Sequence, residues 1–166
     1  LVRQPEYFDR RQLYQEHGHA YVDNCERFSF FSRAVLEICR QMILRPDVIH
    51  CNDWQTGIIN GLLQTQYNGR PGFERTASVI TLHNMAYQGG FGMGQLGELG
   101  FTSEFARSSF SFNGYASAMK AGLEVSDTLS TVSKRYAHEI QTPEFGHGLD
   151  WLTRQRSRRL IGITNG

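Results

Sequence analysis

Seven consecutive residues, His83 to Gly89, gather side chains that can exchange hydrogen bonds with a polar ligand. They supply an imidazole, two carboxamides, a phenol and a glycine. They follow the apolar run 78–82, which predicts a buried parallel strand. Ligands of open α/β sheets bind at the carboxyl ends of the strands, so a loop of this composition suits a polyhydroxylated ligand such as a sugar.

Asp53 and Trp54 are further candidates, and the sequence leaves two roles open for each. Asp53 is either the N-cap of a helix that starts at Trp54, worth on the order of 1 kcal/mol, or a carboxylate that grips sugar hydroxyls. Trp54 is either a core anchor or a platform on which a sugar ring stacks. For His83 a functional role is favoured over core packing, because the exit from a strand into a loop is a surface position.

Four short apolar runs predict the strands that position these residues: 48–51, 78–82, 128–132 and 160–163. They alternate with segments of helical periodicity, which predicts an α/β fold, a Rossmann-like parallel sheet with flanking helices. Parallel strands share a carboxyl edge. The residues that follow the strands should therefore meet there: Asn52-Asp53-Trp54, His83-Asn84, Ser133-Lys134 and Asn165-Gly166.

Helical patterns lie between the strands. The first helix is expected to begin after Asp23 in a capping box with Glu26 and to end before 45–47. Arg33 on this helix should face water, and the core stripe should be Phe28, Phe31, Val35, Ile38 and Met42. Further helices are predicted over 54–63, about 115–125, 134–141 with Ser133 as cap, and 149–156. The sequence predicts a loop over 1–21, whose aromatic residues pack on the core, and a long irregular excursion over 89–114.

Composition excludes several classes of protein. Seventeen Lys+Arg against 16 Asp+Glu leave a net charge of +1, which gives no electrostatic case for nucleic acid or membrane. No apolar run approaches the roughly 20 residues of a membrane span, and residues 1–5 form no signal peptide. The odd cysteine count (Cys25, Cys39 and Cys51) favours reduced thiols in a cytosolic protein. The chain lacks an initiator Met and stops just after a predicted strand, so we expect a fragment.

Motifs for other chemistries are weak. Residues 92–97 match G-x-G-x-x-G, but no strand directly precedes them and no suitable acid follows, which argues against a dinucleotide site. His50 and Cys51 point to opposite faces of a strand and cannot share an ion. His17 and His19 lack a ligand set at recognisable spacing, so no metal site is predicted.

Several segments together resemble one family. They are Asp47-Val-Ile-His-Cys-Asn-Asp53-Trp54-Gln-Thr-Gly57, Thr81-Leu-His83-Asn84-Met-Ala-Tyr87-Gln88-Gly89, Met119-Lys120-Ala121-Gly122, Thr131-Val-Ser133, Gln141-Thr-Pro-Glu-Phe-Gly146-x-Gly148-Leu149-Asp150 and Gly162-Ile-Thr-Asn165-Gly166. Tyr21-x-Asp23-Asn24-x-x-Arg27-Phe28-x-Phe30-Phe31-Ser-Arg33-Ala34 also fits. In this order the segments are similar to bacterial glycogen synthase and plant starch synthase, glycosyltransferase family 5, over nearly the whole chain.

The resemblance implies part of the N-terminal lobe of a retaining GT-B glucosyltransferase. Such enzymes move glucose from ADP-glucose to the non-reducing 4-hydroxyl of an α-1,4-glucan, without a metal or a further cofactor, in the bacterial cytoplasm or in a plant plastid. By position, His83 and Asp53 would be catalytic. Substrate-binding roles would fall to Trp54, Asn84, Tyr87, Gln88 and Asn165.

The chain also departs from the family's pattern. The Lys-Thr-Gly-Gly loop of the N-terminal domain and the C-terminal lobe, which holds most of the nucleotide site, are not in residues 1–166. The partners implied are therefore ADP-glucose, the glucan and the missing lobe, and we expect the fragment to be inactive alone. Two alternatives stay open: a non-catalytic glucan-binding or regulatory module, and a retaining transferase that uses another nucleotide sugar.

Overall fold

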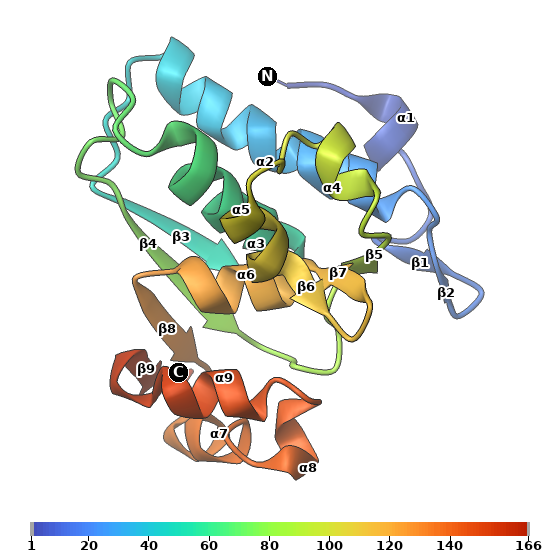
Figure 1. The fold of residues 1–166 in the computed structure, drawn as a ribbon. Helices are drawn as coiled ribbons and strands as arrows, with labels where there is room; N and C mark the ends of the chain where they lie inside the picture. The colour runs from blue at the N-terminus through green and yellow to red at the C-terminus, as the bar shows by residue number, and fades with distance from the viewer. Residues whose placement is uncertain (1, 166) are drawn as a thin grey trace.

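Four parallel strands form the sheet at the centre of the fold (Figure 1). In spatial order they are β3 (Val48–Asn52), β4 (Ala77–Leu82), β8 (Thr128–Thr131) and β9 (Leu160–Gly162). The computed structural model describes residues 2–165, so the predicted position of Gly166 lies outside it. The parallel register places all four carboxyl ends at one edge. The Rossmann-like sheet is confirmed, with strand ends within one residue of those predicted.

Two glycines allow the helices on one face of the sheet to pack closely. These helices are α3 (Asp53–Leu62), extended by η1 (Leu63–Tyr67), and α6 (Ala118–Val125). A Cβ atom on Gly57 would lie 2.1 Å from the carbonyl oxygen of Ala118, and one on Gly122 would lie 2.5 Å from Cδ1 of Ile80. The first contact would force α3 and α6 apart, and the second would push α6 away from β4. On the opposite face of the sheet, Val48, His50 and Asn52 are exposed.

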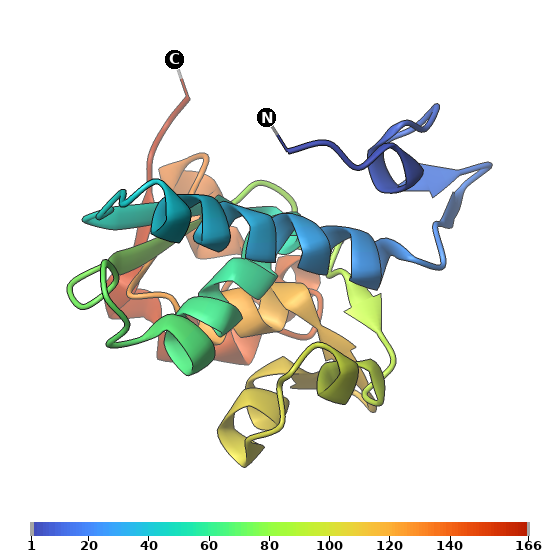
Figure 2. The same ribbon diagram turned by 90° about the horizontal axis from the view of Figure 1, so that it is seen from above.

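Helix α2 (Asn24–Gln41) lies along α3 (Figure 2), and it buries a different face from the predicted one. Its buried residues are Cys25, Arg27, Ser29, Ser32 and Leu36. Of the predicted stripe, Phe28 and Val35 pack against the core, whereas Phe31 is 39% exposed and Met42 is 66% exposed. The small side chains of α2 face α3 because they permit a close approach. Arg33 is half-buried and donates to Gln66 Oε1 at 3.1 Å, so the prediction that it faces water is also wrong.

Residues 2–21 contain more regular structure than the predicted loop. They contain α1 (Pro5–Phe8) and a hairpin of β1 (Gln15–Glu16) and β2 (His19–Ala20). The predicted capping box at Asp23 is wrong, because this side chain makes no cap hydrogen bond. Asp23 Oδ1 accepts instead from Arg10 Nη1 at 2.9 Å, which ties this first segment to the start of α2.

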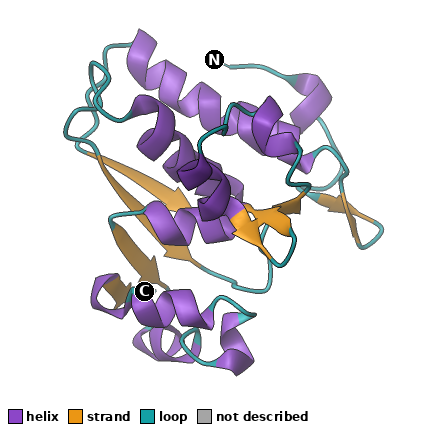
Figure 3. Cartoon of the chain, in the orientation of Figure 1, coloured by secondary structure: helices purple, strands orange, loops and turns teal. Residues whose placement is uncertain are grey.

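The predicted irregular excursion over 89–114 is built of short regular elements (Figure 3). They are β5 (Gly90–Phe91), α4 (Gln95–Glu98), α5 (Glu104–Phe110) and β6 (Ser111–Phe112). The strand β7 (Tyr115–Ser117), which precedes α6, pairs with both β5 and β6 in a small antiparallel sheet. The side chains of Leu96, Phe101 and Phe110 are buried and belong to the hydrophobic core of the lobe, so this segment is packed onto the rest of the fold. The expectation of an irregular segment is therefore wrong.

The last part of the chain packs around β8 and β9. It contains α7 (Lys134–Glu139), α8 (Pro143–Gly146), α9 (Asp150–Gln155) and η2 (Ser157–Arg159). Ser133 caps α7 as predicted, because its hydroxyl accepts from the Tyr136 N–H at 2.9 Å. Within residues 2–165, no helix has the length and apolar character to cross a membrane.

Candidate active site at the carboxyl edge of the sheet

Asp53 joins the ends of β3 and β4. Its Oδ1 atom accepts from the backbone N–H of His83 at 2.8 Å and lies 3.4 Å from that of Asn84. Asp53 adopts the left-handed region with φ of +53°, a conformation that a non-glycine residue takes at a cost. The predicted N-cap role is wrong: Asn52 is the cap residue, and the Thr56 hydroxyl accepts from its N–H at 2.6 Å. Asp53 fixes the loop after β4 instead.

The His83 imidazole stands exposed at the edge, as a strand exit predicts. Its Nε2 lies 3.1 Å from Oδ1 of Asn52, which fixes the orientation of the ring. The Asn84 side chain accepts from the Ala86 N–H at 2.9 Å and so shapes the following turn. The edge thus presents an oriented imidazole on a backbone that is anchored by a carboxylate. Such a group can donate a hydrogen bond to a ligand oxygen.

Trp54 is a core anchor. It is only 7% exposed, and its ring lies 4.8 Å from that of Phe28 and 5.8 Å from that of Tyr14. Gly89 packs so closely that a Cβ atom there would lie 2.3 Å from Cε3 of Trp54. The ring face is therefore covered by protein, and the alternative of a stacking platform fails. Trp54 nevertheless contributes to the lining of the adjoining hollows.

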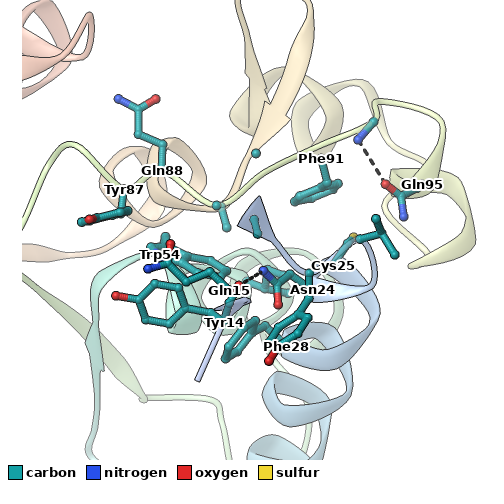
Figure 4. Close-up of a pocket in the computed structure, with 18 of the residues that line it drawn as sticks. Tyr14, Gln15, Asn24, Cys25, Phe28, Trp54, Tyr87, Gln88, Phe91 and Gln95 are labelled. Carbon is teal, nitrogen blue, oxygen red and sulfur yellow. Dashed lines mark hydrogen bonds between the residues drawn. The ribbon is translucent and has the colours of Figure 1, made fainter. Parts of the chain in front are cut away.

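Two hollows meet at this aromatic cluster. The larger, about 600 Å³ in volume, is lined by aromatic side chains and by the carboxamides of Gln15, Asn24 and Gln95 (Figure 4). The smaller, about 130 Å³ in volume, opens beside the carboxyl edge of the sheet. Its six lining residues are Tyr14, Asp53, Trp54, Gln55, Asn84 and Tyr87. Aromatic walls with a few amides suit the apolar faces and hydroxyls of a sugar.

Tyr14 is a site residue that the sequence prediction missed. It lines both hollows, and its ring centroid lies 6.1 Å from that of Tyr87. Tyr87 itself is 47% exposed. Tyr14 falls within the predicted loop 1–21, where no strand end marks it as part of the edge. The sequence offered only an aromatic residue expected to pack on the core.

Gln88 and Asn165 take other positions. Gln88 lines the larger hollow, yet its amide points away from it (Figure 4) and donates to the carbonyl of His147 at 2.9 Å. Asn165 is exposed beyond β9, and β8 separates β9 from β4. The structure therefore brings Asp53, Trp54, His83, Asn84 and Tyr87 together and leaves Asn165 further along the edge.

Cysteines near the site are not nucleophiles. Burial raises the pKa of the Cys25 thiol, which lines the larger hollow, to about 11. Burial likewise raises the pKa of Cys51 to about 12. Both are therefore neutral near pH 7 and unsuited to attack or metal binding. In the part of the chain that the structure describes, no three His, Cys, Asp or Glu side chains gather closely enough to hold a metal ion.

The Rossmann-like sheet has the fold of part of a GT-B glycosyltransferase. More particularly, the chain belongs to the starch synthase catalytic domain family, whose model matches residues 1–155. It is 46% identical to glycogen synthase of Thermodesulfovibrio yellowstonii and 42% identical to that of Aeromonas salmonicida. Both matches cover 100% of this chain and 34% of the relative.

A solved structure is also similar. It is the catalytic domain of starch synthase IV from Arabidopsis thaliana bound to ADP and acarbose, with a TM-score of 0.84 and 34% identity. The match covers 98% of this chain and 33% of that one. The chain thus spans about a third of the length of the proteins it resembles.

Proposed function

We propose that this chain is part of the N-terminal lobe of an enzyme that transfers glucose from ADP-glucose to the non-reducing 4-hydroxyl of an α-1,4-glucan. The observation that carries the proposal is the Asp53 carboxylate, which holds the loop of His83 and Asn84 at the carboxyl edge, beside an aromatic hollow. Support comes from glycogen synthases that match the whole chain. The similar starch synthase IV structure is bound to ADP and acarbose.

We propose a task for each residue of this site. In a retaining transfer the bond between the sugar C1 and the ADP oxygen breaks, a bond from C1 to the acceptor oxygen forms, and the acceptor hydroxyl passes its proton to the leaving phosphate oxygen of ADP. The oxocarbenium-like sugar and the leaving diphosphate both need charge stabilisation. His83 faces the donor sugar, and Asp53 with Asn84 holds it there. Tyr87 and Trp54 form the acceptor wall.

Two residues act at the margins of this site. Gln88 shapes the acceptor wall through its hydrogen bond to the His147 carbonyl. Asn165, beyond the last strand, approaches the donor once the second lobe is present. That lobe, which we propose lies in the rest of the protein, supplies most of the nucleotide site, so the isolated chain is inactive.

We further propose that the reaction needs no metal and no cofactor besides the nucleotide sugar. The enzyme would act in the cytoplasm of a bacterium or in the plastid of a plant. Glucan synthesis that persists in excess EDTA would support the first point, and a dependence on added divalent cation would contradict it.

The experiment is glucan synthesis by the full-length protein from ADP-glucose and maltooligosaccharide, compared between wild type, His83→Ala and His138→Ala. His138 is an exposed histidine on α7 and serves as the control. Loss of an electrostatic donor at the transition state should lower kcat about 100-fold or more in His83→Ala, and His138→Ala should match wild type. Undiminished synthesis by His83→Ala would overturn the role of His83. Parallel assays with UDP-glucose identify the donor.

A further inference from the structure

Arg27 is a buried cation that reaches back to the first segment of the chain. It is 2% exposed and uses three nitrogens as donors. Nε donates to the Tyr7 carbonyl at 2.7 Å, and Nη2 donates to the Leu13 carbonyl at 2.8 Å. Nη1 donates to Oδ1 of Asn24 at 2.6 Å. Two of these acceptors belong to residues 5–21, which we call the arm.

The three acceptors of Arg27 are neutral, and aromatic rings lie beside its guanidinium. Its guanidinium lies 5.0 Å from the ring centroid of Tyr21, 5.3 Å from that of Phe28 and 5.7 Å from that of Phe8. Within residues 2–165 it forms no ion pair with a carboxylate. A charge buried in this way needs all its donors satisfied. The planar guanidinium of arginine spreads its donors over three nitrogens that point in different directions, whereas the donors of lysine share a single nitrogen.

The arm places Tyr14 in the candidate site. The Tyr14 carbonyl accepts from Nδ2 of Asn24 at 2.8 Å and from the N–H of Tyr21 at 3.2 Å. Its neighbour Leu13 is held by Arg27. With the backbone fixed on both sides, the Tyr14 ring stands against Trp54 and Tyr87 and lines both hollows. Arg27 lines neither hollow.

We propose that Arg27 is a positioning residue for the glucan acceptor: its fork locks the arm, and the arm sets Tyr14 as the wall shared by the two hollows. The proposal rests on the proposed function, in which this wall receives the acceptor. The effect of Arg27 passes through Tyr14. Substitutions of Arg27 and of Tyr14 should therefore both weaken binding of the glucan acceptor. The double variant should bind the acceptor no more weakly than either single variant.

The test uses the full-length protein and steady-state kinetics with both substrates. Arg27→Lys keeps the charge and loses the fork, and we expect the KM for maltooligosaccharide to rise about 10-fold while kcat and the KM for ADP-glucose stay near wild type. Tyr14→Ala should do the same, and the double variant should add little to either. Arg40→Lys, an exposed arginine on the same helix, is the control.

Hydrogen exchange measured by mass spectrometry reports on the arm directly. Exchange over residues 5–21 should quicken in Arg27→Lys and stay unchanged in Arg40→Lys, with the rest of the lobe unaltered. Arg10→Gln, which releases the arm from Asp23 at the surface, provides a second loosening variant should Arg27→Lys fail to fold. Equal rises in both KM values, additive effects of Arg27→Lys and Tyr14→Ala, or unchanged exchange of the arm would each overturn the proposal.

Failure of the proposed function looks different. A wild-type protein that makes no glucan from either donor would contradict the glucosyl transfer. The role of Arg27 in fixing the arm would still be tested by hydrogen exchange of the arm and by calorimetric titration with maltooligosaccharide. Weaker binding in Arg27→Lys than in wild type would support it, and equal binding would overturn it.

Discussion

The carboxylate of Asp53 accepts a hydrogen bond from the backbone N–H of His83 across 2.8 Å, so that the end of one strand positions the loop of the next. The two residues are 30 positions apart in sequence and meet because β3 and β4 are parallel neighbours. A hydrogen bond with a charged acceptor contributes about 1.5–3 kcal/mol. The charge on Asp53 is thus a direct target for mutation.

Asp53→Asn tests that charge. Asparagine tolerates a φ of +53° and keeps an oxygen acceptor, so the backbone should be preserved while the bond to His83 weakens. We expect kcat/KM of the full-length protein to fall about 10- to 100-fold with little change in melting temperature. Asp53→Ala should lose as much activity and should also have a lower melting temperature, because alanine is strained in the left-handed backbone conformation. Wild-type kinetics in both variants would contradict the anchoring role.

Gly89→Ala should disrupt the aromatic cluster. Its Cβ atom would lie 2.3 Å from Trp54, on a residue with φ of +60°. Overpacking of a core costs about 1–3 kcal/mol, and the strained backbone adds to this. The matched control is Gly94→Ala, whose Cβ meets nothing within 4 Å at a helical φ of −61°. Thermal denaturation should show a clearly lower melting temperature for Gly89→Ala and an unchanged one for Gly94→Ala. Equal melting temperatures of the two variants would refute the close contact.

Lys120 should matter more to stability than a surface lysine. Its Nζ donates to the carbonyls of Ser108 at 2.8 Å and Ser109 at 3.1 Å, and it pairs with Glu124 while nearly buried. Lys120→Met leaves these acceptors without a donor. Each buried group that is left unpaired should lower the free energy of unfolding by about 1–3 kcal/mol.

The control for this substitution is Arg135→Met, which removes an exposed pair of the same i,i+4 spacing and should cost about 0.5 kcal/mol or less. Chemical denaturation of the full-length variants compares the two. Similar losses for both substitutions would show that the Lys120 contacts stabilise no more than surface ones.

The thiols predict a pH dependence. Because burial raises the pKa of Cys25 to about 11 and of Cys51 to about 12, their thiolates are scarce in the folded protein at pH 9. Alkylation at that pH should label Cys39, which is only half-buried, well before the other two. In the unfolded chain the same thiols ionise at about pH 8.5. Stability should therefore be unaffected by these groups below that pH and fall as pH rises toward 12.

Peptide mapping by mass spectrometry checks the order of labelling, and melting temperature against pH checks the sign of the stability change. Cys51→Ala should flatten the decline in melting temperature above pH 9. A variant whose decline is as steep as that of wild type would contradict the assignment to Cys51.

The sequence was informative where a residue's position follows from a single strand. The run 78–82 is rich in apolar residues and has the length of a buried strand, and its end places His83 at the edge. Asp53 was located in the same way, but its role as an anchor was not predicted. That role depends on which strand lies beside β3, and this pairing is a property of the whole sheet.

Predictions failed where packing partners decide the outcome. On α2 both the Phe31 side and the Ser32 side are compatible with burial, and the close approach of α3 selected the small residues. In the segment 89–114 the elements are as short as two residues, too short for any periodicity to appear. Tyr14 was missed because its place depends on Arg27 and Asn24, which lie outside the arm.

The hydrogen bonds of the loop 83–89 restrict how the molecule can move. Besides the bond from His83 to Asp53, the Met85 N–H donates to the Tyr136 hydroxyl at 3.0 Å, and Gln88 donates to the His147 carbonyl. Fixed at three points to three different segments, this loop cannot swing as a flap. Movement of this loop relative to α3 or α7 would break these hydrogen bonds, so we expect the loop to move together with the rest of the described lobe. A ligand that reaches His83 would therefore meet a backbone whose geometry is set before binding.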